Sequence, residues 1–161
     1  METPKLKKVL IAMDLDPTAQ KVAEIGYSFA KAMGAEVILL HVMVDAIYYS
    51  SIENFPIMGY TGSVIAPLLL KAGADSKNES QEYLNKIKHH LGDENIQTVV
   101  KEGDSADRIL STAQELNVDL IVMGSVSRRW LEEILMGSVT EKVLHHSTIP
   151  LFIIPTKNPK K

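Results

Sequence analysis

Five short apolar runs, separated by segments whose apolar residues recur at helical spacing, constrain the fold of this chain more than any other feature. Runs without polar alternation are typical of strands buried on both faces of a parallel sheet. The runs occupy residues 8–13, 37–44, 96–101, 120–123 and 149–154. This pattern predicts an α/β, Rossmann-like fold: a doubly wound parallel sheet of five strands, with helices on both faces and ligands at the carboxyl ends of the strands.

Capping and stop signals predict a helix after each of the first four runs. A capping residue before an apolar-periodic segment indicates a helix start, and a glycine just after it indicates a stop. The start signals are Asp16-Pro17 with Asp16 as the N-cap, Ser76-x-x-Glu79, Gly103-Asp104-Ser105 and Ser138-x-x-Glu141. The stop signals are Gly34 and Gly92.

Residues 45–72 break this alternation. They combine tyrosines, prolines and glycines with apolar patches and show no clean period, whereas a disordered linker would be more polar. We expect a long excursion between the second strand and the second helix. It would cover either the mouth of a pocket or a subunit partner.

The stretch from Leu120 to Thr140 contains the clearest candidate site. Residues 125–136 separate Gly124 from Gly137, a connection about twice the usual strand-to-helix length of roughly 2–6 residues. A helix N-terminus offers unpaired N–H groups and a partial positive charge, which suit phosphate. A glycine beside it lets the backbone approach a ligand closely. The stretch therefore predicts an anion site.

Two arginines in this loop, Arg128 and Arg129, are able to pair with phosphate oxygens. A simpler interpretation stays open at this point. Ser138 would then cap its own helix, the two glycines would only turn the chain, and the arginines would be solvated.

Composition and charge exclude several classes of function. The chain has 161 residues, 45% apolar and 23% charged, which fits one soluble domain over residues 1–161. A net charge of −3 does not favour nucleic acid, and the basic tail at 156–161 is interpreted as solvating. The absence of cysteine excludes disulfides and thiolate chemistry. With neither a signal peptide nor an apolar run of roughly 20 residues, we expect a cytoplasmic protein without a membrane partner.

Catalytic and metal motifs are missing from the sequence. It contains no P-loop, no G-x-G-x-x-G and no G-x-S-x-G. The adjacent histidine pairs at 89–90 and 145–146 diverge around their helices and do not form a metal site. His41 is interpreted as a satisfied buried imidazole, and Asp14 and Asp16 lack a nucleophile or acid partner. No catalytic residue and no metal ligand is predicted.

The chain resembles the universal stress protein family over nearly all of its length. The resemblance rests on KKVLIAMDLDPTAQKV, AEVILLHVMV, EGDSADRIL, and DLIVMGS with LMGSVTEKVLHHSTIPLFIIP. It implies the flavodoxin-like strand order 3-2-1-4-5. Nucleotide-binding members carry G-x2-G-x9-G-[ST]. Here Gly124 takes the first place and Gly137-Ser138 the last pair, with Ser127 in place of the second glycine.

The resemblance implies a site for an adenine nucleotide, ATP or AMP, with Mg²⁺ as an open question. Asp14 would lie near the ribose or adenine, Val42 would hold the adenine through backbone groups, and Met123 would line the pocket. The residues around the ribose and phosphates would be Gly124, Ser127, Gly137, Ser138, Val139 and Thr140, with Arg128 beside them. Asp16 replaces a more common serine, and its carboxylate would repel phosphate unless it caps the helix or holds Mg²⁺.

Three functions are compatible with these observations. The first is a nucleotide-binding, dimeric stress-response sensor or regulator. The second is a dimeric interaction protein of the branch that does not bind nucleotides, with Ser127 and Asp16 as marks of a decayed site. The third is an enzyme such as a slow ATPase.

The last apolar run predicts an interface between two copies of the chain. Pro150 at its start fits an edge strand, where a missing N–H is tolerated. The following residues, Leu151, Phe152, Ile153 and Ile154, form a flat hydrophobic edge without a protecting charge. We expect a two-fold homodimer through this strand, and the family resemblance implies the same contact.

Overall fold

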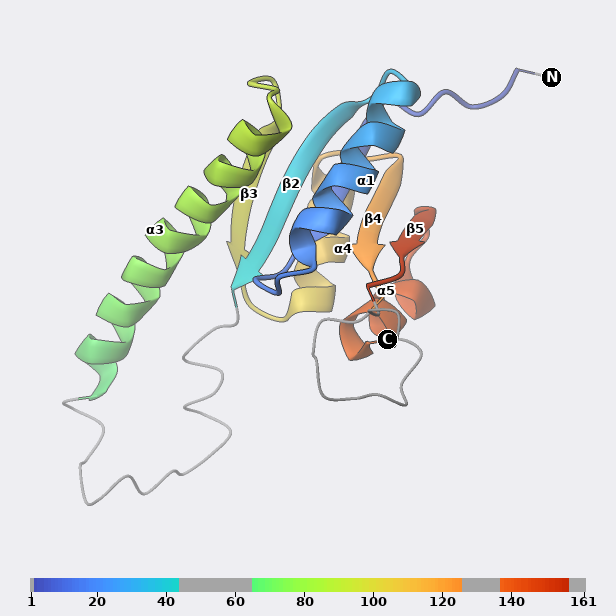
Figure 1. Cartoon of the computed structure of the whole chain (residues 1–161). Helices are drawn as coiled ribbons and strands as arrows, with labels where there is room; N and C mark the ends of the chain where they lie inside the picture. The colour runs from blue at the N-terminus through green and yellow to red at the C-terminus, as the bar shows by residue number, and fades with distance from the viewer. Residues whose placement is uncertain (1, 44–64, 126–136, 157–161) are drawn as a thin grey trace, which may run out of the picture.

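All five predicted strands are present and pair in parallel in one sheet of order β3-β2-β1-β4-β5 (Figure 1). The computed structural model describes residues 2–43, 65–125 and 137–156, with residues 65–76 described by their backbone only. The strands are β1 (Lys8–Met13), β2 (Glu36–Met43), β3 (Gln97–Glu102), β4 (Leu120–Gly124) and β5 (Leu151–Ile154). The helices are α1 (Ala19–Ala32), α3 (Ile65–Leu91), α4 (Ser105–Glu115) and α5 (Ser138–His146). The predicted fold class and strand order are confirmed.

Two apolar layers sandwich the sheet, which explains why the inner strands β1, β2 and β4 are almost entirely apolar, whereas the edge strand β3 also carries polar residues. Val9 and Ile11 of β1 are fully buried against α1 and α3, and Leu10 between them is fully buried against α4 and α5. Because successive strand residues point to opposite faces, both faces need apolar side chains. None of the helices in the described ranges is long and apolar enough to cross a membrane.

The predicted helix stops are confirmed. Gly34 has φ +69° and Gly92 has φ +71°, the left-handed conformation that favours glycine. At the end of α1 the Gly34 N–H donates to Lys31 O at 3.0 Å and the Ala35 N–H donates to Ala30 O at 2.9 Å, the bond pair of a Schellman motif.

The helix starts follow the sequence less closely. Asp104 caps α4 as predicted, accepting from the Asp107 N–H at 3.0 Å. Asp16 instead caps the turn before α1, because its Oδ1 accepts from the Thr18 N–H at 2.9 Å while the helix begins at Ala19. The predicted capping box at Ser138 is wrong, since Gly137 is the N-cap of α5 and Ser138 is its first helical residue.

The largest correction concerns α3, which begins at Ile65 and not near Ser76. Its 27 residues span about 40 Å, whereas the eight residues of β2 span about 26 Å. The first part of α3 therefore extends past the carboxyl ends of the strands (Figure 1). Pro67 is compatible with this start because it lies in the first turn, where its missing N–H has no helical partner. The predicted excursion is shortened accordingly, and its remainder, residues 45–64, lies outside the described residues.

Candidate functional site

The strand register brings the predicted site residues of β1, β2 and β4 to the carboxyl edge of the sheet. Met13 at the end of β1 pairs with His41, which puts Asp14 beside Val42. On the other side of β1, Ile11 pairs with Val122, which puts Gly124 level with Met13. The buried Met123 lies directly below this edge in β4.

The N-terminus of α5 lies at the same edge. The Gly137 N–H donates to Ser125 O at 2.7 Å, and the Thr140 hydroxyl donates to Gly124 O at 2.9 Å. Gly137 has φ −67° and ψ 154°, and it makes no side-chain cap. No oxygen among the described residues accepts from the N–H groups of Ser138, Val139 or Thr140. The described residues thus leave three donors at this helix N-terminus, the kind of group that binds an anion.

The backbone of Gly137 also decides between two explanations for this glycine. Its φ is negative and its ψ is extended, a conformation open to any residue. The alternative that this position is a turn requiring a positive φ is therefore wrong.

The packing around position 124 explains why a glycine occupies it. A Cβ at this position would lie 2.9 Å from Thr156 Cγ2 and 3.2 Å from Val22 Cγ2. Both distances are shorter than ordinary carbon contacts. The glycine therefore lets the end of β4 pack against α1 and against the segment that follows β5.

Ser125 joins these elements and was not singled out by the sequence. Its N–H donates to Ile154 O at 2.9 Å, its carbonyl accepts from the Gly137 N–H, and its Oγ accepts from the Thr156 N–H at 3.1 Å. One residue thus holds the end of β5 and the start of α5. Only its place directly after Gly124 could have pointed to it.

The two aspartates after β1 have different environments. Asp14 is half-buried, and its Oδ1 accepts from the Asp16 N–H at 3.0 Å. Burial raises the pKa of Asp14 and the nearby Asp16 carboxylate adds to the rise, while the Asp16 N–H and a charge on His41 oppose it. Asp16 Oδ1 is occupied by Thr18, through the N–H and through the hydroxyl at 2.8 Å. The capping explanation for Asp16 therefore holds for the turn before α1.

His41 is buried in β2 with 7% of its surface exposed. Its Nδ1 lies 2.8 Å from Met13 O. Because a carbonyl only accepts hydrogen bonds, Nδ1 carries the proton and donates. The interpretation of His41 as a satisfied buried imidazole is confirmed.

Other parts of the predicted site lie outside the described residues. Ser127, Arg128 and Arg129 belong to this group. Within the described part of the chain, no group of three His, Asp or Glu side chains could hold a metal ion.

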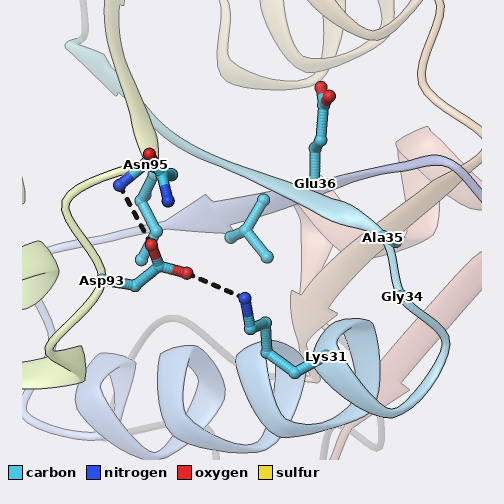
Figure 2. Close-up of a pocket in the computed structure, with 8 residues that line it drawn as sticks. Lys31, Gly34, Ala35, Glu36, Asp93 and Asn95 are labelled. Atoms are coloured by element: carbon cyan, nitrogen blue, oxygen red, sulfur yellow. Dashed lines mark hydrogen bonds and ion pairs between the residues drawn. The ribbon is translucent and has the colours of Figure 1, made fainter.

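A hollow of about 560 Å³ lies at the opposite, amino edge of the sheet (Figure 2). Its lining residues are Lys31, Gly34, Ala35, Glu36, Val37, Asp93, Asn95 and Ile96. Asp93 already accepts from Lys31 Nζ at 3.1 Å, from the Tyr27 hydroxyl at 3.1 Å and from the Asn95 N–H at 2.9 Å. These bonds occupy both carboxylate oxygens, and none of the predicted site residues lines the hollow. We therefore place the candidate site at the carboxyl edge.

Comparison with known proteins agrees with this architecture. The family model described as the universal stress protein family matches residues 5–155. Universal stress protein MJ0577 of Methanocaldococcus jannaschii is 32% identical over 163 aligned positions, covering 94% of this chain and 96% of that protein. The chain belongs to the universal stress protein family.

Solved structures of the family share the fold. The MJ0577 structure superposes with a TM-score of 0.75 at 27% identity, covering 97% of this chain and 100% of that chain. A universal stress protein in complex with cAMP gives a TM-score of 0.61 at 19% identity, covering 96% and 100% of the two chains. The universal stress protein from Archaeoglobus fulgidus in complex with dAMP gives 0.56 at 18% identity, covering 93% and 98%.

Proposed function

We propose that this chain binds an adenine nucleotide, ATP or AMP, at the carboxyl edge of its sheet and acts as a dimeric regulator in a stress response. The observation that carries the proposal is the N-terminus of α5, where no described residue accepts from three N–H groups and where the Thr140 hydroxyl donates to Gly124 O. Such a terminus favours phosphate through its donors and its dipole. Universal stress proteins in complex with cAMP and dAMP support an adenine nucleotide as the ligand class.

The base and ribose would lie between β1 and β2. The pairing of β1 with β2 ends at Met13 and His41, whereas β2 continues to Met43. Val42 and Met43 thus lie beyond the last residue pair of the two strands, and the proposal places a flat ligand against the backbone of Val42. Asp14 stands at this opening with its Oδ2 unbonded to any described donor, so it can accept from a ribose hydroxyl or an adenine amino group.

Calorimetric titration with ATP and Mg²⁺, beside GTP, tests the proposal. We expect saturable binding of ATP and weaker binding of GTP. No heat and no thermal shift up to several millimolar ATP would refute nucleotide binding. That result would favour the alternative of an interaction protein that does not bind nucleotides, in which Ser127 marks a decayed site.

Gly137→Val tests where the phosphates bind. Valine fits φ −67° and ψ 154°, so we expect the melting temperature to stay within about 2 °C of wild type. The branched side chain would cover the helix N-terminus and abolish ATP binding, with Gly137→Ala intermediate. Unchanged affinity in Gly137→Val would show that the phosphates are not at α5.

The homodimer through β5 is the second part of the proposal. β5 is an edge strand of the sheet, and its Leu151, Phe152 and Ile153 are only half-buried. The centroids of the Phe152 ring and the Phe29 ring of α1 lie 5.0 Å apart. Phe29 itself is 38% exposed. A second copy pairing with β5 would cover this uncharged edge.

A further inference from the structure

The position of Asp14 is fixed from both sides by hydrogen bonds. After it, the Asp16 N–H holds Oδ1 at 3.0 Å. Before it, the carbonyl of Met13 accepts from Nδ1 of His41 at 2.8 Å. That second bond fixes the plane of the peptide between Met13 and Asp14, and so the direction in which the chain leaves β1.

His41 is suited to hold this carbonyl because the ring cannot move away. The residue lies in β2, is buried, and follows the fully buried Leu39 on the same face of the sheet. Met13 is the last residue of β1 that pairs with β2. The imidazole thus supplies a donor where the pairing of the two strands stops.

Among the described residues, the ionisable groups besides His41 that interact with Asp14, the residue next to the carbonyl bonded by His41, lie on two elements. Asp14 and Asp16 lie on the loop after β1, and the half-buried Tyr83 faces them from α3. Burial raises the pKa of Tyr83, and the two carboxylates raise it further. The phenol is therefore a neutral neighbour at ordinary pH.

We propose that His41 is a positioning residue of the nucleotide site, which holds the Met13 carbonyl and thereby places the Asp14 carboxylate against the nucleoside. This inference rests on the proposed function. It assigns to a core histidine a role in ligand affinity in addition to its role in packing.

Three variants separate the two roles. His41→Leu fills the space without a donor, and His41→Asn keeps an N–H donor close to the place of Nδ1. Leu39→Val is the matched control, since it lies two residues earlier on the same face and weakens packing without touching the Met13 carbonyl. Each is measured by calorimetry with ATP, by thermal melting, and by carbon NMR titration of the Asp14 carboxyl in the ligand-free protein.

We expect His41→Leu to weaken ATP binding about tenfold, the worth of one hydrogen bond, and to shift the Asp14 titration. His41→Asn should restore most of the affinity, and Leu39→Val should lower the melting temperature only. Wild-type affinity and an unchanged Asp14 titration in His41→Leu would overturn the inference. If the wild-type protein binds no nucleotide, the proposed function fails, yet the Asp14 titration still tests the positioning by His41.

Discussion

Replacing Gly124 by alanine tests whether this motif glycine serves packing or ligand approach. The added Cβ would meet Thr156 Cγ2 at 2.9 Å and Val22 Cγ2 at 3.2 Å. Overpacking of this kind costs about 1–3 kcal/mol. Alanine also restricts the unfolded chain, which returns about 0.4–1 kcal/mol because the φ of Gly124 is not positive. The net loss is about 1–2 kcal/mol, or about 2–8 °C in melting temperature for a chain of this size.

Urea unfolding followed by circular dichroism measures this loss of stability. Gly137→Ala is the control, because alanine can adopt the backbone conformation of Gly137. The double variant Gly124→Ala with Thr156→Ser removes the methyl group that the new Cβ would strike. We expect it to recover most of the lost stability, relative to Thr156→Ser alone. A Gly124→Ala protein that is as stable as wild type but binds ATP more weakly would refute the packing argument and assign the glycine to the ligand.

Two further predictions concern the edge strand and the acid stability. Pro150 O, just before β5, accepts from the Ile121 N–H of β4, and Ile154 O accepts from the Ser125 N–H just after β4. Because successive strand residues alternate in direction, the backbone of Ile153 faces away from β4. Ile153→Pro should then yield a folded monomer in sedimentation at micromolar concentration, whereas Ile153→Ala should remain dimeric; a wild-type monomer would contradict the interface. At the start of β1, the N–H groups of Lys7 and Lys8 lower the pKa of Asp119. The folded pKa lies below the unfolded one, so this stabilisation is present above about pH 4 and is lost as the pH falls through the folded pKa. The gap in unfolding free energy between wild type and Asp119→Asn should therefore narrow from pH 7 to pH 3; a constant gap would contradict the assignment.

The sheet could be predicted because its physical cause is local in sequence. Strands covered on both faces need apolar residues at every position, as β1 shows with Val9, Leu10 and Ile11. The ends of α1 and α3 at Gly34 and Gly92 could be predicted as well, because a left-handed residue at a helix end favours glycine. The start of α3 could not be predicted. Ser76 and Glu79 are acceptable inside a helix as well as at its cap, and sequence alone does not distinguish the two.

The candidate site was predictable only in part for a related reason. Spacing identified Gly124 and Gly137 but not what each does. Gly124 is crowded by Thr156, 32 positions further on, and such a contact exists only in the folded chain. The bond from His41 to Met13 O likewise follows from the register of β1 with β2 and from no motif.

Ser125 also depends on tertiary contacts. It links the two parts of the proposed function, the dimer contact at β5 and the phosphate site at α5. Its N–H is bonded to the last residue of β5, and its carbonyl is bonded to the N-cap of α5. A two-fold partner would bind the outer edge of β5, and a phosphate would bind the N–H groups next to Gly137. Dimerisation and phosphate binding would therefore each act on a residue that is hydrogen-bonded to Ser125. A shift of β5 relative to β4 must therefore either stretch the bond between Ser125 and Ile154 or move the start of α5 with it.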